Sequence, residues 1–111
     1  MAEPLGYQFT VDCADPAGLA AFWAQALGFE PDAHHSGQDG RYAAIRDPRR
    51  RPGGRIVFQR VAEPKTVKNR AHLDVLCGGE RRAEQVARLV ALGASVLGEV
   101  DEAAGRWTVL A

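Results

Sequence analysis

The sequence predicts an α+β fold made of two similar halves, and three observations lead to this prediction. The chain has 111 residues, of which 46% are hydrophobic, so it can bury the core of one ordinary domain. A pattern of one strand followed by one helix occurs twice, in residues 7–29 and 71–94, and Cys13 and Cys77 match at a spacing of 64 residues. Both copies end their helix on Leu-Gly. Such a repeat predicts two half-domains that face each other, with a site where they meet.

The first copy begins with a strand and continues into a helix. Residues 7–13 alternate between apolar and polar side chains, as a half-buried strand does. Asp15 as N-cap and Pro16 at the first helical position begin a helix, and Gly28 ends it in a left-handed conformation. Further strands are predicted at residues 29–35, 41–46 and 55–61, followed by a polar linker at about 62–69.

The second half repeats this order with fewer strands. Residues 70–77 are predicted to form a strand, residues 80–92 a helix capped by Gly93, and residues 94–100 and 106–110 two more strands. The order is therefore β-α-β-β-β, then β-α-β-β. We expect a single domain, residues 1–111, with module one at about 5–62 and module two at about 70–111, the second module lacking its last strand.

Alternation along the two first strands divides their side chains between two faces. The apolar set packs on the helices, which need apolar sheet surface: Phe9, Val11, Cys13, Leu73, Val75 and Cys77. The polar set faces away from the helices, where it is either solvated or converges in a cleft: Gln8, Thr10, Asp12, His72 and Asp74. Cysteines in apolar company are expected to be core residues rather than nucleophiles, and Trp23 on the helix stripe is expected in the core as well.

Composition excludes several classes of function. Fourteen basic and fourteen acidic residues give a net charge of zero, which does not favour nucleic acid or an acidic membrane. No apolar run approaches the roughly 20 residues of a membrane span, and the N-terminus does not resemble a signal peptide. These features and the two cysteines favour a cytoplasmic location. His34 and His35 are expected to be a solvated pair beside a turn.

One basic cluster stands out against this neutral background. Residues 46–55, RDPRRRPGGR, contain five arginines among prolines and glycines, which predicts a loop. The loop is either a solvated hairpin tip or a tip that binds an anion or a partner.

Three phrases together resemble the vicinal oxygen chelate superfamily of glyoxalases, bleomycin-resistance proteins and dioxygenases. They are VDCADPAGLAAFWAQALGFEP, IVFQRVAEPKTVKNRAHLDV and RLVALGASV, and they cover most of the chain. The sequence is most similar to small bacterial glyoxalase-like proteins of actinobacterial type. The resemblance implies paired βαβββ modules whose sheets curl around a shared cavity, and it implies a homodimer.

The resemblance implies no certain cofactor, but some members of the family use a divalent metal, which here would be Zn, Ni, Fe or Mn. The family's ligand positions correspond to Gln8, Gln59 and His72, and the fourth ligand, usually a Glu in a later strand, has no equivalent in these residues. Amide oxygens are weaker ligands for transition metals than imidazole or carboxylate. Gln8 could therefore be a structural or substrate-contacting amide, and His72 a hydrogen-bonded histidine of the cleft.

Three functions follow as hypotheses. The first is a metal-independent small-molecule binder, the second a metal-dependent lyase, isomerase or dioxygenase that uses His72 and Gln8, and the third a non-catalytic dimerising domain. In each case we expect a small molecule or a second copy of the chain as the partner, and neither nucleic acid nor a membrane. The residues expected to line the ligand cavity are Gln8, Thr10, Asp12, Tyr42, Gln59, His72, Asp74 and Trp107.

Overall fold

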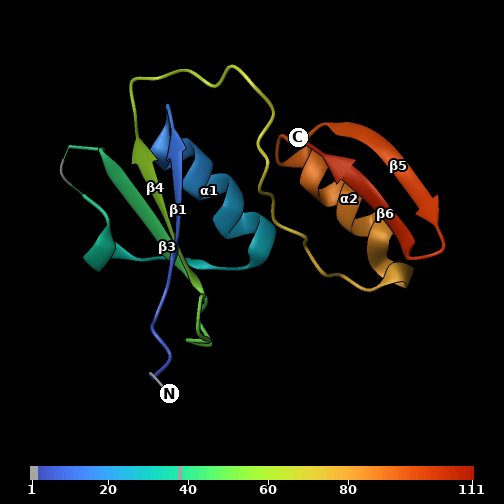
Figure 1. The fold of residues 1–111 in the computed structure, drawn as a ribbon, viewed down its shortest axis with the longest axis horizontal. Helices are drawn as coiled ribbons and strands as arrows, with labels where there is room; N and C mark the ends of the chain where they lie inside the picture. The colour runs from blue at the N-terminus through green and yellow to red at the C-terminus, as the bar shows by residue number, and fades with distance from the viewer. Residues whose placement is uncertain (1–2, 38) are drawn as a thin grey trace. The chain divides into compact units, whose positions relative to one another are not determined.

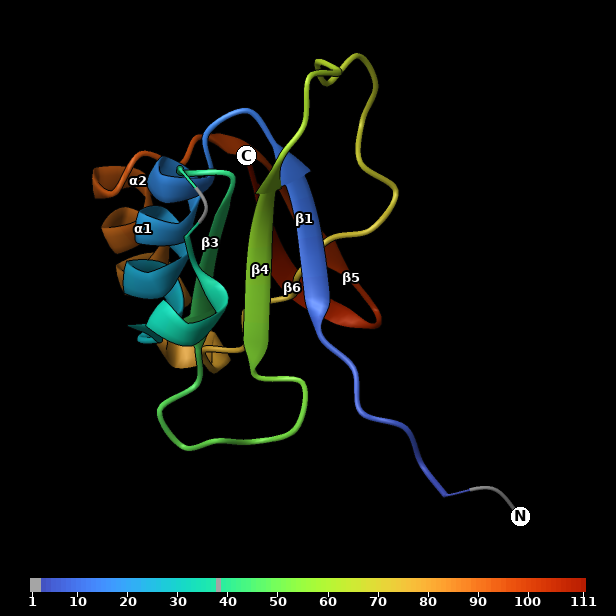
Figure 2. The same ribbon diagram turned by 90° about the vertical axis from the view of Figure 1, so that its left-hand side faces the viewer.

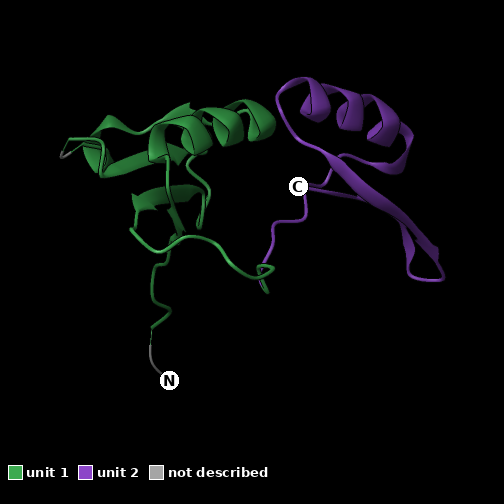
Figure 3. Ribbon diagram, turned by 90° about the horizontal axis from the view of Figure 1, so that it is seen from above, with its two compact units in different colours: residues 1–70 green, residues 71–111 purple. Residues whose placement is uncertain are grey.

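The computed structural model describes residues 3–37 and 39–111 and divides the chain into two compact units (Figure 3). Unit 1 is Met1–Arg70 and unit 2 is Ala71–Ala111. Within the part of the chain that the structure describes, no helix has the length and apolar character that crossing a bilayer requires.

Unit 1 is a four-stranded sheet with one α-helix (Figure 1). Its strand order is β1-β4-β3-β2; β1 runs parallel to β4, and the other neighbouring strands are antiparallel. The elements are β1 (Phe9–Cys13), α1 (Pro16–Leu27), β2 (Glu30–Pro31), the 3₁₀ turn η1 (Ala33–His35), β3 (Tyr42–Arg46) and β4 (Arg55–Arg60). The strand predicted over residues 29–35 is wrong beyond residue 31, because the chain there turns into η1.

Helix α1 begins and ends at the residues that the sequence predicts. The Asp15 side chain accepts a hydrogen bond from the Gly18 N–H at 3.1 Å, and Pro16 occupies the first turn. Gly28 ends the helix with φ of 70°, a left-handed conformation that glycine adopts without steric cost.

Replacing Asp15 by alanine is expected to lower the free energy of unfolding by about 1 kcal/mol, because the Gly18 N–H loses its acceptor. Urea denaturation followed by circular dichroism measures the change. Asp15→Asn, which keeps a capping oxygen, is the control and should retain most of the stability. An equal loss in both variants would contradict the capping role.

The core of unit 1 lies between α1 and one face of the sheet, and Figure 2 shows helix α1 beside the strands of this sheet. The buried centre is Ala20, Ile45, Ile56 and Phe58, and the partly buried residues packed on it include Val11, Cys13, Leu19 and Trp23. The predicted helix-facing positions of Val11, Cys13 and Trp23 are confirmed. Phe9, at the start of β1, is an exception: it lies outside this cluster and is 49% exposed.

Unit 2 is a helix and a β-hairpin. Its elements are η2 (Gly79–Arg81), α2 (Arg82–Ala91), β5 (Val96–Glu102) and β6 (Gly105–Leu110), with β5 and β6 antiparallel. The predicted strand at residues 70–77 is wrong, since residues 71–78 have no regular structure. In unit 1 the matching strand, β1, pairs with β4. Among the residues described in unit 2 no strand takes the place of β4, so residues 71–77 have no partner for a backbone ladder.

Candidate functional site

The sheet of unit 1 has an open face on the side opposite α1, and a polar row crosses it. Asp12 of β1 and Tyr42 of β3 are both register partners of Gln59 on the central strand β4. Partners in register point to the same side of a sheet, so these three side chains stand side by side. The row combines a carboxylate, an amide and a phenol, and Arg41 lies over the Tyr42 ring at 5.4 Å.

The neighbouring row on the open face is smaller and less polar. Thr10 pairs with Val57, and Val57 pairs with Ala44. Val57 and Ala44 are buried, whereas Thr10 is exposed. Next to the polar row, this second row is therefore accessible only at Thr10.

The third row, at the far end of the open face, is dominated by charge. Arg55 Nη1 donates to Gln8 Oε1 at 3.3 Å, and Arg46 Nε donates to Glu30 Oε1 at 2.7 Å. Arg46 and Arg55 are register partners. Of the five predicted cavity residues in unit 1, Asp12, Gln59 and Tyr42 stand together, Thr10 lies in the next row, and Gln8 lies in this third row.

The predicted metal ligands of unit 1, Gln8 and Gln59, lie apart along the sheet. Gln59 stands beside Asp12, four residues further along β1 than Gln8, which is about 13 Å at 3.3 Å per residue. Both oxygen donors are neutral amides, and the Gln8 amide oxygen already faces the positive guanidinium of Arg55. In residues 3–37 and 39–111, no group of three or more His, Cys, Asp or Glu residues could hold a metal ion.

The predicted site residues of unit 2 are exposed. His72 Nε2 and Asp74 Oδ1 are 3.4 Å apart, and their side chains are 76% and 81% exposed. Trp107 is the register partner of Val100 on the hairpin and is 41% exposed.

Two buried carboxylates of unit 1 were not predicted from the sequence. Asp32, 2% exposed, accepts hydrogen bonds from Arg55 Nε at 3.1 Å and His35 Nδ1 at 3.0 Å. Burial opposes ionisation of Asp32, but the His35 and Arg55 contacts outweigh it and lower the pKa of this carboxyl. His34 and His35 are both exposed, as predicted, and His35 in addition contacts the Asp32 carboxylate.

Asp47 organises the arginine-rich loop after β3. It is 2% exposed and accepts hydrogen bonds from the Arg49 N–H at 2.9 Å and from Arg51 Nε at 2.5 Å. Burial raises the pKa, but these donors and Arg49 Nε outweigh it and lower the pKa of Asp47 to about 2. A single acidic residue among five arginines already indicates ion pairing within the loop, but only the fold shows that this residue is buried.

The Cys13 thiol carries no sign of activation. Cys13 and Cys77 are free, and burial raises the pKa of the Cys13 thiol. A raised pKa keeps the thiol protonated at neutral pH, which disfavours a nucleophilic role for Cys13.

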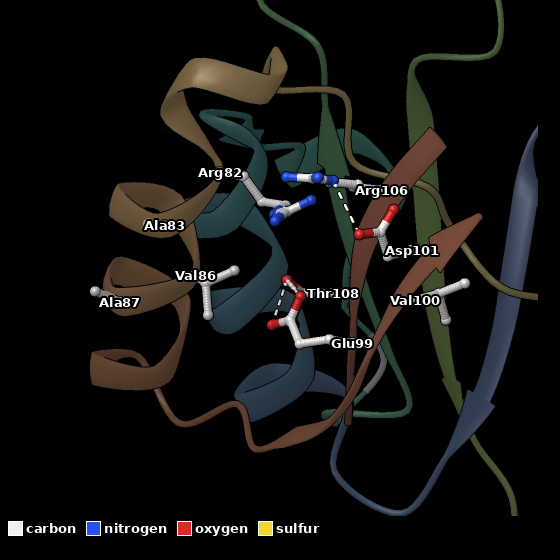
Figure 4. Close-up of a pocket in the computed structure, with 9 residues that line it drawn as sticks. All are labelled: Arg82, Ala83, Val86, Ala87, Glu99, Val100, Asp101, Arg106 and Thr108. Atoms are coloured by element: carbon white, nitrogen blue, oxygen red, sulfur yellow. Dashed lines mark hydrogen bonds and ion pairs between the residues drawn. The ribbon is translucent and has the colours of Figure 1, made fainter. Parts of the chain in front are cut away.

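Unit 2 contains a pocket of about 550 Å³ between α2 and the hairpin, a site that was not predicted from the sequence (Figure 4). Thr108 Oγ1 donates to the Glu99 carboxylate at 2.9 Å, and Arg106 Nε pairs with Asp101 at 3.2 Å. Glu99 and Asp101 are two residues apart on β5, so alternation places both carboxylates on one face of the strand, and this spacing is visible in the sequence. The lining residues are Arg82, Ala83, Val86, Ala87, Glu99, Val100, Asp101, Arg106 and Thr108.

Comparison with known proteins gives one family and one fold. A family model described as a glyoxalase-like domain matches residues 8–111. Among curated proteins, none matches the chain.

Solved structures with 16–17% identity share the fold. A glyoxalase/bleomycin resistance protein/dioxygenase family enzyme from Burkholderia phytofirmans superposes with a TM-score of 0.71 and 16% identity, covering 93% of this chain and 86% of its own. A possible glyoxalase from Bacillus cereus superposes with a TM-score of 0.64 and 17% identity, and the match covers 95% of each chain. The third structure is a variant of the fosfomycin resistance protein FosX from Listeria monocytogenes, complexed with Mn(II) and 1S,2S-dihydroxypropylphosphonic acid. It superposes with a TM-score of 0.69 and 16% identity, and the match covers 94% of this chain and 75% of the FosX chain.

Proposed function

Because this chain belongs to the glyoxalase-like domain family, we propose that it binds a small organic molecule on the open face of unit 1 without a resident metal. The observation that supports the proposal is the row of Asp12, Gln59 and Tyr42, which crosses three strands on the face opposite α1. A fold can host many functions, so the proposal depends on these side chains and not on the family alone.

The chemistry of the open face suits a ligand with several groups that donate and accept hydrogen bonds. Asp12 accepts hydrogen bonds, Gln59 both donates and accepts, and the Tyr42 hydroxyl does both as well. Val57 and Ala44, next to this row, are buried, so the ligand contacts proposed here are those of the polar side chains. Small-molecule sites commonly depend on a few fixed polar groups of this kind.

The ligand can be found with a thermal-shift screen of planar aromatic compounds and antibiotics, followed by titration calorimetry of the best compound. Gln59→Ala is expected to weaken binding at least tenfold, because it removes the central donor and acceptor of the row, and Tyr42→Phe should weaken it less. Arg60→Ala changes the next residue of β4, which alternation places on the opposite face, and should leave affinity unchanged. Uniformly null shifts, or equal losses in Gln59→Ala and Arg60→Ala, would contradict the proposal.

A second candidate is a metal-dependent enzyme, favoured by the Mn(II) complex of the FosX neighbour. Its ligands would include His72 and Gln8. Against it stand the separation of Gln8 and Gln59 along the sheet and the guanidinium beside Gln8. Elemental analysis of the purified full chain decides between the two. About one divalent ion per chain that is lost in His72→Ala would support the enzyme and overturn metal-free binding.

A further inference from the structure

The arginine-rich loop between β3 and β4 is held in one compact shape. The Asp47 N–H donates to the Gly54 carbonyl at 2.6 Å, and two turns follow: Arg50 N–H to Asp47 O at 2.9 Å and Gly54 N–H to Arg51 O at 3.1 Å. The buried Asp47 carboxylate fastens the interior of this loop through Arg49 and Arg51. A side chain at Gly54 would meet the Asp47 Cβ at 2.7 Å, so the loop closes tightly against itself. Guanidinium groups are therefore presented from a fixed backbone.

Positive charge exceeds negative charge around this loop. Arg46 pairs with Glu30, Arg49 and Arg51 share Asp47, and Arg55 pairs with Asp32. Five arginines thus meet three carboxylates, which leaves an excess of two positive charges. Among the described residues, the Arg50 side chain makes no hydrogen bond or ion pair, and its backbone stands in the left-handed region with φ of 57°.

Hydrogen-bond donors remain for a ligand. The ion pairs of Arg46 and Arg51 both use Nε, and a guanidinium has five N–H groups, so the terminal nitrogens of both arginines still have donors to offer. The loop and Tyr7, which precedes β1, line a pocket of about 280 Å³, here called the hairpin pocket. Its lining contains four arginines and one carboxylate, Arg46, Asp47, Arg50, Arg51 and Arg55, and the Tyr7 ring lies against Gly53.

We propose that the hairpin pocket binds the phosphate group of a small molecule. Guanidinium groups recognise phosphate by paired, charge-assisted hydrogen bonds. Several guanidiniums approaching from different residues match an anion with three terminal oxygens better than a planar carboxylate with two. A long polyanion such as nucleic acid is disfavoured, because the chain has zero net charge and this cluster is confined to one loop.

This site is separate from the row proposed to bind the organic ligand. Asp12, Gln59 and Tyr42 do not line the hairpin pocket. Arg55 is the link between the two regions, because it lines the pocket and also donates to Gln8 on the open face. Phosphate binding in the hairpin pocket therefore does not require that the polar row binds an organic ligand, and each can be measured without the other.

The test is a titration of the full ¹⁵N-labelled chain with inorganic phosphate and, in a second arm, with glycerol 3-phosphate, both at constant ionic strength. Saturable shifts of the amides of residues 50, 51 and 53–55 are expected, since Pro52 has no N–H group. A tighter apparent Kd for glycerol 3-phosphate would identify an ester, rather than the free ion, as the preferred source of the phosphate. Sodium sulfate and sodium chloride titrations measure general attraction of anions.

Variants locate the site. Arg50→Gln and Arg46→Gln are each expected to weaken phosphate binding at least tenfold, and the amide spectrum of each variant reports whether the fold is kept. Arg60→Gln removes the same charge from the other end of β4 and should leave the affinity within about twofold, since Arg60 does not line the pocket. Non-saturating shifts, or an equal loss in Arg60→Gln, would overturn the proposal in favour of unspecific charge attraction.

Discussion

Replacing Phe58 by alanine is expected to lower the free energy of unfolding by about 3–5 kcal/mol. Phe58 is fully buried on β4 and belongs to the same core cluster as Ala20, Ile45 and Ile56. The variant loses the transfer free energy of the ring and leaves a cavity under α1. A loss of this size approaches the total stability of many small domains, about 5–15 kcal/mol, so much of the chain could unfold at physiological temperature. Urea denaturation followed by circular dichroism measures the change.

The matched control for this prediction is Phe9→Ala. Phe9 is the same residue type in the neighbouring strand, but it is 49% exposed and outside the buried cluster. Its removal should cost about 1 kcal/mol or less. Similar losses in the two variants would show that the core does not lie where α1 meets β4.

Asp47→Asn is expected to destabilise the chain at neutral pH by an amount that shrinks in acid. In the folded chain the pKa of Asp47 is lowered from 3.8 to about 2, because hydrogen bonds from Arg49 and Arg51 outweigh the effect of burial. A lowered pKa stabilises the fold above the pKa of the unfolded chain, and this contribution disappears as pH falls through the folded value. The stabilisation by Asp47 is therefore complete above about pH 5 and is lost between about pH 4 and pH 2.

The measurement is the difference in unfolding free energy between the wild-type chain and Asp47→Asn at pH 7, 5, 4, 3 and 2. Titration of other groups, including Asp32, largely cancels in this difference. The control is Asp39→Asn, an exposed residue in the preceding turn whose φ of 60° asparagine tolerates. Asp39→Asn should differ little from wild type. A difference for Asp47→Asn that stays constant down to pH 2 would contradict the proposed role of the ionised carboxylate.

Local signals in the sequence account for most of unit 1. The Asp15-Pro16 start and the Gly28 end of α1 are short-range features, since a cap depends on residues within one turn. The apolar and polar faces of β1 follow from alternation, which a strand imposes whatever its neighbours are. Strands β3 and β4 were predicted within one residue at each end, because β-branched, apolar and aromatic residues mark them.

Strand pairing explains where the prediction for unit 2 failed. Residues 70–77 have the alternating pattern of a strand, yet residues 71–78 have no regular structure. A strand exists only through hydrogen bonds to a neighbour, and no local pattern reveals whether that neighbour is present. Strand register cannot be read from a local pattern either. Gln8 and Gln59 lie on the same face of the sheet, but the partner of Gln59 on β1 is Asp12, four residues beyond Gln8, and this alignment of β1 on β4 is set by the fold.

The amino-acid sequence alone predicts the family resemblance, the α+β class, the limits of α1 and the polar face of β1, because each depends on composition or on residues close together in the chain. Tertiary structure alone decided which polar residues meet. It placed Gln59 between Asp12 and Tyr42, directed Arg55 to Gln8 and Asp32, and buried Asp47 among the arginines of its loop. The physical reason is that such contacts join segments up to 47 residues apart, and their geometry is set by strand register and burial rather than by local propensity.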